Sequence, residues 1–488
     1  MILAPAFWQR WSLLCLILLG CPVLFGCGER EAERTADGRI ILQYWEKWGS
    51  FEAEAMRRVV DDYNASQDRV LVRFLTVSQI DQKVLLATAG GNPPDIAGLW
   101  GYMVPSYAEK NALTPLNDYI ERAGIKGEDY YPALWDTVSH RDYVWALPTT
   151  PATVGLHWNK KLFREAGLDP ERPPQSIAEL DEMVEKLTIV AFERDGEPVE
   201  VRYSEMTDAE KAAMADDRNA SDFQIIQLGH SPTWPGWWLD MWGYWWGASL
   251  VSEDGTRVTP TDEANVGGMA WLRSYTEKFG TRNLLGFGSS FGNFGSPQNP
   301  FLEGRIAMVL QGVWLYNFID QFSPQMEWGA APFPSVDPER LPNVTILESD
   351  VLVVPKGALH PQEAFNFIAY VNQQGPMEKL CLGHRKFSPL VHTSERFLED
   401  HPNPYIEVFI ELASSPNART TPLIPLWQEY KAELIVSANS IYRQTLDPLE
   451  GMERVENRVQ RKLDRSVRRW ELTREARLAE WEGNDDQR

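Results

Sequence analysis

The sequence is poor in cysteine, with four among its 488 residues. Cys15 and Cys21 lie in an apolar N-terminal segment and Cys27 follows it, so Cys381 is left without a partner for a disulfide. A scaffold held together by disulfides is therefore excluded. The sequence also lacks a Cys-x-x-Cys pair, which removes the usual cysteine-based metal and redox motifs. We expect Cys381 to be buried and inert.

Positive charge is also scarce. The chain carries 47 Lys and Arg against 69 Asp and Glu, a formal net charge of −22 at pH 7. Proteins that bind nucleic acid present a basic surface to the phosphates, so this balance argues against a nucleic-acid partner. Hydrophobic residues make up an ordinary 43% of the chain, and its length suits two or three folded domains.

Catalytic and metal-binding motifs are absent or incomplete. None of the seven histidines forms an i, i+4 pair or a His–Glu metal motif, and there is no Walker A or EF-hand loop. Gly288–Gly292 matches Gly-x-Ser-x-Gly, but that pattern positions a nucleophile only between a strand and a helix, and its surroundings here are rich in Gly and Asn. The sequence therefore predicts a protein that is not an enzyme and that uses neither a metal nor a cofactor.

The N-terminus has the pattern of an export signal. Residues 1–26 hold one charge, Arg10, and an apolar run that is too short for a comfortable membrane span. The run ends in Leu24–Cys27, which resembles a bacterial lipobox, so we predict a signal peptide at 1–26 and lipidation of Cys27. Residues 27–38 would be a lipidated tether that anchors an exported protein in the cell envelope, at the periplasmic or extracellular face. An ordinary signal or anchor helix is the alternative.

Short apolar runs alternate with helical patterns in the segment that follows. Ile40–Trp45, Val70–Val77 and Asp95–Trp100 have the composition of buried strands. Apolar residues at helical spacing begin at Ser50 and recur over Ile80–Ala89. The order strand, helix, strand, helix, strand predicts a parallel α/β sheet.

Four further segments are distinctive. Ala191–Ser221 has little apolar periodicity and is predicted to be a surface insertion with a polar helix over Thr207–Asp217. Phe279–Pro300 is rich in Gly, Asn and Ser and is predicted to be a loop, and Glu253–Gly255 a turn. Apolar residues at spacings of three and four over Met452–Trp470 predict an amphipathic C-terminal helix. Its other face is locally basic and would either be solvated, with the helix packed on the body, or contact a membrane or a partner.

Tryptophan, in contrast, is abundant: there are 20, six of them between Trp234 and Trp246. Four of the six recur at helical spacing and are predicted to share the core face of a helix: Trp238, Trp242, Trp245 and Trp246. Trp234 and Trp237 precede or begin this helix, beside Pro235-Gly236, and are predicted to face a ligand. An indole ring stacks well on the C–H face of a sugar, whose hydroxyls form hydrogen bonds with charged or amide groups.

Four motifs along the chain match those of one protein family. They are Gly90–Ile96 (Gly-Gly-Asn-Pro-Pro-Asp-Ile), Asn159–Pro170, Phe301–Trp314 with its pattern Phe-x-x-Gly-x-x-Ala-Met-x-x-x-Gly-x-Trp, and, more weakly, Val351–Gly357. In this order, behind a lipobox-like segment, they make the chain resemble the family 1 extracellular solute-binding proteins of bacterial ABC importers, the maltose-binding-protein-like group. The resemblance covers roughly residues 40–450.

The resemblance implies an α/β fold of the periplasmic-binding-protein type, with a ligand cleft between two lobes. Crossover hinge strands are expected near Pro148–Val154 and Ile346–Val351. The expected segments are 39–150 and 346–405 for lobe 1, and 151–345 (with the insertion 191–221) and 406–488 (with extra C-terminal helices) for lobe 2.

Carried over position by position, the resemblance also implies which residues contact the ligand. The set of predicted ligand-binding residues is Trp45, Glu46, Trp48, Trp100, Trp234, Trp237, Trp314, Glu348, Asp350 and Trp427. For Trp314 a place in the core of its lobe is the alternative. Whether the carboxylates of Glu348 and Asp350 flank a sugar ring is left open by the sequence.

These expectations combine into one function. A lipid-anchored monomer would capture a carbohydrate, an oligosaccharide or glycoside, by closure of its lobes and deliver it to the permease subunits of an ABC transporter. The rival is a secreted carbohydrate-active enzyme such as a glycoside hydrolase, which explains the tryptophans equally well but needs an acid/base pair of carboxylates. A surface protein that keeps the fold but has lost transport is the third alternative.

Overall fold

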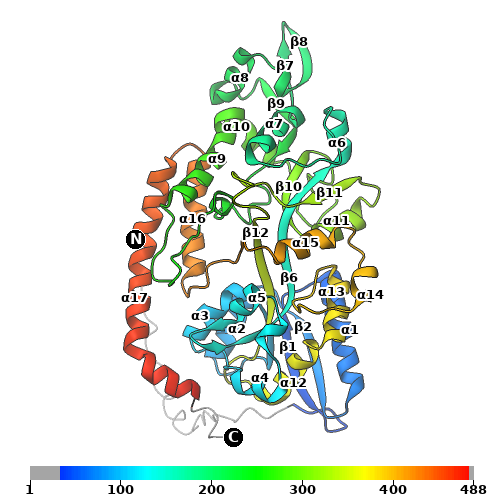
Figure 1. Ribbon diagram of the computed structural model, residues 1–488, viewed down its shortest axis with the longest axis vertical. Helices are drawn as coiled ribbons and strands as arrows, with labels where there is room; N and C mark the ends of the chain where they lie inside the picture. The colour runs from blue at the N-terminus through cyan, green and yellow to red at the C-terminus, as the bar shows by residue number, and fades with distance from the viewer. Residues whose placement is uncertain (1–32, 483–488) are drawn as a thin grey trace, which may run out of the picture.

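The computed structural model describes residues 33–482, which form two lobes stacked along the long axis of the molecule (Figure 1). The predicted signal peptide at 1–26 and the predicted lipidation site Cys27 lie outside the described residues. Within residues 33–482, no helix is both long and apolar enough to cross a membrane. One sheet connects the two lobes, and its main path has the order β2-β1-β3-β12-β6-β10-β9-β7-β8. The predicted α/β class is confirmed.

Lobe 1 is built on a parallel sheet whose strands alternate with helices. β1 (Ile40–Glu46) lies between β2 (Val70–Thr76) and β3 (Ile96–Trp100) and is parallel to both. α1 (Ser50–Ser66) and α2 (Ile80–Ala89) connect these strands. The predicted strand–helix order is confirmed, because the apolar residues recur with the period of each element and are buried.

Two long strands run from one lobe into the other (Figure 1). β6 (Ala146–Asn159) is buried along its whole length, and β12 (Thr345–Val353) lies antiparallel beside it. Toward lobe 1, β12 pairs with β3, and toward lobe 2, β6 pairs with β10 (Ile306–Gly312). The two strands occupy the positions predicted for the crossovers and bring their side chains to the space between the lobes.

Lobe 2 continues the sheet from β10. β9 (Phe223–His230) is parallel to β10, and the antiparallel strands β7 (Ile189–Arg194) and β8 (Glu197–Arg202) end the path. β11 (Trp328–Ala331) pairs with β6. The predicted surface insertion therefore contains a hairpin of this sheet, and its polar helix is α8 (Asp208–Ala215).

The remaining elements surround or link these sheets. In chain order they are α3 (Val104–Glu109), α4 (Asn117–Ala123), α5 (Pro132–Val138), the hairpin of β4 (Ser139–His140) and β5 (Tyr143–Val144), α6 (Lys160–Glu165), α7 (Ile177–Leu187), α9 (Glu263–Phe279), α11 (Leu315–Phe322), α12 (Pro361–Val371), α13 (Gln374–His384), α14 (Glu395–Glu399), α15 (Ile406–Ala413), β13 (Ala418–Arg419) and α16 (Trp427–Tyr442). α13 packs in the core of lobe 1 and α15 in that of lobe 2, so the link between them is a third crossing.

The aromatic segment does not form the predicted α-helix. Only Trp242–Trp246 forms a short 3-10 helix, and Gly236 and Gly247 adopt positive φ on either side of it. Gly243 lies so close to Asn265 on α9 that an added Cβ would overlap its side chain. Close packing on α9, and not one helical face, therefore positions these rings. Trp238, Trp242 and Trp245 are buried as expected, and Trp246 is half-buried.

Phe279–Pro300 is not a loop throughout, so that prediction is wrong in part. α10 (Thr281–Gly288) occupies its first half, because Leu284 and Phe287 are buried in the core of lobe 2 despite the high glycine content around them. The Gly-x-Ser-x-Gly match follows this helix and does not follow a strand. It therefore lacks the geometry of a nucleophile elbow.

α17 (Pro448–Glu482) is the predicted amphipathic C-terminal helix. Its first half buries Met452 and Leu463 in the core of lobe 2. Its last turns pack on lobe 1, where Trp481 is buried in the core. The end of the helix thus lies outside the lobe expected for 406–488, because one continuous helix of 35 residues reaches across both lobes (Figure 1).

Two smaller expectations agree with the structure. Cys381 is buried in lobe 1, where burial raises the pKa of its thiol and keeps it protonated. In the turn expected at Glu253–Gly255, Asp254 accepts hydrogen bonds from Ser252 and Thr256.

Candidate functional site

Two adjoining pockets lie between the lobes. The first, here called the charged pocket, has a volume of ≈ 360 Å³ and is lined by Lys47, Glu52 and Asp350, among others. The second, the aromatic pocket, has a volume of ≈ 440 Å³ and lies beside α11 and Trp237. Glu52 and Trp314 line both, so the two pockets form one elongated cleft.

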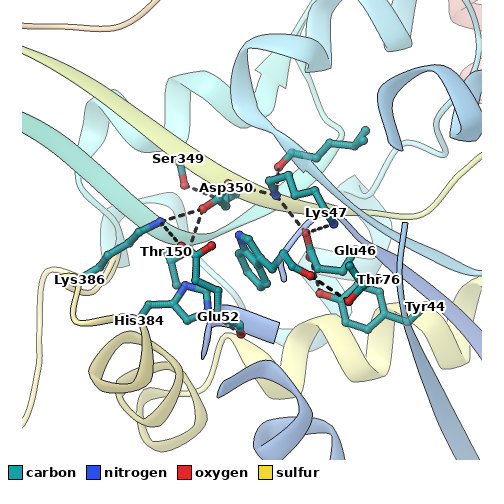
Figure 2. A network of polar contacts seen from close by, with 12 residues as sticks. Tyr44, Glu46, Lys47, Glu52, Thr76, Thr150, Ser349, Asp350, His384 and Lys386 are labelled. Carbon is teal, nitrogen blue, oxygen red and sulfur yellow. Dashed lines mark hydrogen bonds and ion pairs between the residues drawn. The ribbon is translucent and has the colours of Figure 1, made fainter. Parts of the chain in front are cut away.

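Asp350 on β12 lies at the centre of the charged pocket, between two lysines (Figure 2). Its carboxylate is 3.0 Å from Lys47 Nζ and 3.3 Å from Lys386 Nζ. It also accepts a hydrogen bond of 2.9 Å from Thr150 on β6. Burial alone would raise the pKa of this carboxyl, but the two ammonium groups hold it well below its usual value. Asp350 therefore stays ionised and fixes both lysines.

Lys47 directly follows β1, and neighbouring residues accept all the hydrogen bonds that its ammonium group can donate. Besides the ion pair with β12, its ammonium group donates to Glu46 (3.1 Å) and to the carbonyl oxygen of Leu99 (3.1 Å). Glu46 is fully buried and accepts a 2.6 Å hydrogen bond from the hydroxyl of Tyr44. Gly98 makes room for this carboxylate, because an added Cβ would overlap it. Glu46 thus supports Lys47 from behind and does not face the pocket.

Lys386 and Glu52 close the opposite side of the charged pocket. Lys386 Nζ is 3.8 Å from Glu52 Oε1 and 5.8 Å from the ring centre of Trp314. Burial raises the pKa of the Glu52 carboxyl, although the charge of Lys386 opposes this shift. Lys386 is thereby held on three sides, by Asp350, Glu52 and an indole ring.

Glu348 lines the charged pocket, and its side chain has no hydrogen-bond or ion-pair partner among residues 33–482. It lies on β12, two residues before Asp350. Burial raises the pKa of its carboxyl to about 7, and the charges of Asp350 and Asp240 add to this shift. Lys431 and Lys386 oppose it without forming an ion pair. The Glu348 carboxyl is therefore about half ionised at neutral pH, and its oxygens are available to form hydrogen bonds with a ligand.

Three of the predicted tryptophans line the charged pocket. Trp48 packs edge-on against His384, with ring centres 4.5 Å apart, and Trp100 stacks on Tyr102 at 6.1 Å. Trp314 stands at the junction of the two pockets. These indoles give the pocket flat apolar walls beside its charged groups.

The aromatic pocket is walled by rings from both lobes. Trp237, which is 41% exposed, lies 4.8 Å from Phe294 and 6.1 Å from Trp314 between ring centres. Phe51 on α1 and Phe318 on α11 face each other across the lobes at 6.4 Å. Its polar side chains are few: Ser50, Glu52 and Gln321. This end of the cleft therefore favours flat, weakly polar surfaces.

The structure places six of the ten predicted residues on the cleft: Trp48, Trp100, Trp237, Trp314, Glu348 and Asp350. Glu46 is buried behind it, and Trp45 packs half-buried on the core of lobe 1. Trp234 packs on Phe294, with ring centres 5.7 Å apart. Trp427 begins α16 and is 1% exposed in the core of lobe 2, so it does not reach the cleft.

The polar half of the site was not predicted from the sequence; it comprises Lys47, Glu52, Thr150 and Lys386. Charged residues next to strands and helices are normally solvated, so their type alone gives no signal. The one local hint is the position of Lys47 between Trp45 and Trp48. The aromatic signal in Phe51, Phe294 and Phe318 was present, but phenylalanine is most often a core residue.

The cleft combines charged groups that are committed to one another with aromatic rings. Asp350 is ionised and shared by two lysines, so it is not free to act as a general acid. Within residues 33–482, no group of three His, Cys, Asp or Glu side chains is arranged to hold a metal ion. The cleft offers stacking surface, together with carboxyl oxygens on Glu52 and Glu348.

Asp240, whose charge acts on Glu348, allows the electrostatics of this region to be tested. It is 1% exposed, and neither of its carboxylate oxygens has a hydrogen-bond partner among the described residues. Burial raises its pKa to about 6, from an ordinary value of 3.8. The folded protein therefore binds this proton more tightly than the unfolded chain, and the free energy of unfolding falls as pH rises from 3.8 to about 6.

We expect Asp240→Asn to remove this penalty and to raise the free energy of unfolding by about 1–3 kcal/mol at neutral pH. The gain should nearly vanish at about pH 3 or below, where the wild-type carboxyl is protonated in both the folded and the unfolded state. Urea unfolding at the two pH values measures this, with the exposed Asp61→Asn as the matched control. An equal gain at both pH values would contradict the assignment.

A family model described as bacterial extracellular solute-binding protein matches residues 58–392. Among relatives by sequence, the maltotriose-binding protein of Pyrococcus abyssi is 21% identical over 308 residues, which cover 63% of this chain and 56% of that protein. The sn-glycerol-3-phosphate-binding periplasmic protein UgpB of Escherichia coli K12 is 29% identical over 150 residues, covering 29% of this chain and 34% of that protein. The chain thus matches about half the length of the maltotriose-binding protein and about a third of the length of UgpB.

Solved structures share the fold. CpMnBP1 with mannotriose bound superposes with a TM-score of 0.70 at 24% identity, covering 86% of this chain and 99% of that chain. The sugar-binding protein MalE from Xanthomonas citri gives a TM-score of 0.67 at 17% identity, covering 88% and 99%. The predicted two-lobed architecture is thereby confirmed.

Proposed function

Because the chain belongs to the bacterial extracellular solute-binding proteins, we propose that it captures a carbohydrate between its lobes and delivers it to the permease of an ABC importer. The observation that carries the proposal is the position of Trp314, which stands between a pocket with charged acceptors and a pocket of aromatic rings. An elongated saccharide has the matching chemistry, with C–H faces for the rings and hydroxyls for the carboxylates.

The relatives support a saccharide as the ligand. One is named for maltotriose, and one solved structure with this fold holds mannotriose. Both are short oligosaccharides, and the joined pockets of this chain give its cleft an elongated shape. We therefore place an oligosaccharide or glycoside along the cleft, with Trp314 beside the bond between two of its units.

Capture proceeds by lobe closure. Lobe 1 contributes Trp48 and Trp100 to the cleft, together with Asp350 from the part of β12 that pairs with β3. Lobe 2 contributes Trp237 and Trp314. A ligand that contacts residues of both lobes binds the closed state more tightly than the open state. The difference between the two binding free energies shifts the equilibrium toward closure. The permease then recognises the closed shape.

The protein is exported, in accordance with its extracellular family. We propose that Cys27 carries a lipid anchor and that residues 27–38 tether the lobes to the membrane as a monomer. Metabolic labelling with a radioactive fatty acid tests the anchor. Wild type should incorporate the label and Cys27→Ala should not, and labelling of both would assign the lipid to another residue.

The ligand class is tested by a thermal-shift screen of sugars, amino acids and peptides against the purified protein. We expect oligosaccharides to raise the melting temperature, because a ligand that binds only the folded state stabilises it. The carbohydrate assignment fails if no saccharide stabilises the protein. The rival glycoside hydrolase is tested separately by incubation with a glycan panel, where cleavage products would overturn the binding-protein proposal.

Trp237→Ala is expected to weaken saccharide binding about three- to tenfold, because Trp237 covers only one side of the aromatic pocket. The free energy of unfolding should change little, since the ring is 41% exposed. Fluorescence titration measures the affinity. The buried Trp427→Phe serves as the control and should lower stability while leaving the affinity unchanged. Unchanged affinity in Trp237→Ala would remove the aromatic pocket from the ligand path.

A further inference from the structure

The positive groups of the charged pocket are already neutralised. Lys47 is held by Asp350, Glu46 and the carbonyl oxygen of Leu99, all within 3.1 Å. Lys386 is held by Asp350 and by Glu52. Among the described residues that line this pocket, both ammonium groups therefore already have carboxylate counter-ions.

The negative groups of the pocket are in excess. Glu348 faces the same space as Trp100 and Trp314 and lacks a partner among the described residues. Asp240, buried nearby, adds its own negative charge. The pocket thus combines indole rings with a carboxyl that is about half ionised at neutral pH, and a bound cation, which both attract, favours its ionised form.

We propose that Glu348 makes the cleft selective for charge: a saccharide with a protonated amino group binds more tightly than its neutral analogue, and an acidic analogue binds most weakly. This rests on the proposed capture of a carbohydrate. An ammonium group forms a charge-assisted hydrogen bond with the Glu348 carboxylate, stronger than the bond from a neutral hydroxyl. A carboxylate or phosphate there faces Glu348 and Glu52 with no free cation to offset the repulsion.

The test compares maltotriose, mannobiose and cellobiose with their aminodeoxy and uronic acid derivatives, by calorimetric titration of the whole protein. For the neutral sugar that binds, at least one amino derivative should bind about tenfold more tightly, and the acidic derivatives about tenfold more weakly. In Glu348→Gln the preference for the amine should collapse to about twofold or less. Glu253→Gln, an exposed charge in a surface turn, is the control and should keep the full preference.

The outcomes separate the two proposals. If a neutral sugar binds and no amino derivative binds more tightly, charge selectivity is overturned and carbohydrate capture stands. A preference for the amine that survives in Glu348→Gln also overturns the role of Glu348. If no saccharide of any charge binds, the proposed function fails, and the selectivity proposal fails with it.

α17 carries a second inference, which does not depend on the ligand. In lobe 2 the helix buries Met452, Val455, Val459 and Leu463 against the core. In lobe 1 its other end inserts Trp481 between Trp145 and Tyr143, with ring centres 4.8 and 5.2 Å away (4% of Trp481 remains exposed). The helix is thus anchored by buried side chains in both lobes.

Polar contacts reinforce the end that docks on lobe 1. Asn111 donates a 2.6 Å hydrogen bond to Glu480, and the hydroxyl of Tyr143 donates to Glu482 at 3.3 Å. The guanidinium of Arg141 lies 4.5 Å from the ring centre of Trp470. A continuous helix anchored at both ends resists a large change in the angle between the lobes, because a sharp kink in it would break backbone hydrogen bonds.

We infer that α17 is a strap that restrains the hinge, so that the lobes rotate fully only when Trp481 leaves its site on lobe 1. Single-molecule energy transfer between dyes on Asp68→Cys in lobe 1 and Glu253→Cys in lobe 2 tests this. Trp481→Ala should add a population at a second transfer efficiency, and Trp470→Ala should do so to a smaller extent. Leu472→Ala, an exposed position of the same helix, is the control. One unchanged population in both tryptophan variants would overturn the strap.

Discussion

Replacement of Asp350 with alanine is expected to lower the free energy of unfolding by about 3–5 kcal/mol. The change leaves Lys386 with only the more distant Glu52, at 3.8 Å, and Lys47 with only Glu46 as a counter-ion. Each buried ammonium group then keeps a desolvation cost that its remaining contacts do not offset. Urea unfolding at neutral pH measures the loss.

The pH dependence provides an internal check on this effect. The pKa of Asp350 is lowered in the folded protein, so its stabilisation is present above the ordinary value of 3.8 and is lost as the pH falls below it. Wild type and Asp350→Ala should therefore converge in acid. Asp61→Ala, on the exposed side of α1, is the control and should change stability by less than about 0.5 kcal/mol. A loss below about 1 kcal/mol in Asp350→Ala would show that the ion pairs around Asp350 contribute little to the free energy of unfolding.

Trp314→Ala is expected to weaken saccharide binding by at least about thirtyfold, the largest effect of any single ring in the cleft. The reason is its position, because it lines both pockets and lies beneath the ammonium group of Lys386. Its loss removes stacking surface from both parts of the ligand and frees Lys386 to move. Calorimetric titration with the oligosaccharide found in the screen measures the change.

The fold should survive this substitution, because Trp314 is only half-buried. Circular dichroism and urea unfolding check that expectation, and Trp314→Phe should recover part of the affinity. An unfolded Trp314→Ala protein would favour the alternative role of Trp314 as a cap of the lobe 2 core. A folded protein with unchanged affinity would place the ligand elsewhere.

Local sequence patterns predicted most of the fold. The strand–helix order of lobe 1 followed from apolar periodicity, because burial requires a period of two in strands and 3.6 in helices. The same rule failed for the tryptophans near Trp242, where helical spacing occurs without a helix because glycines allow close packing on α9. It also failed for α10, whose few buried residues were hidden by the surrounding glycines.

The site was predicted less completely than the fold. Tryptophans at strand ends were a usable signal, and Trp48, Trp100 and Trp314 do line the cleft. Trp427 has the same chemistry, but tertiary packing buries it in lobe 2, and no local pattern separates the two cases. Lys47 and Lys386 lie far apart in the sequence and meet only because β12 brings Asp350 between them.

Isothermal titration calorimetry of the protein with neutral oligosaccharides tests the central claim most directly. Capture of a carbohydrate in the cleft predicts saturable binding at one site per chain, weakened at least about thirtyfold in Trp314→Ala and retained in the core variant Trp427→Phe. The contradicting result is an absence of binding heat for every saccharide while an amino acid or peptide binds the same protein.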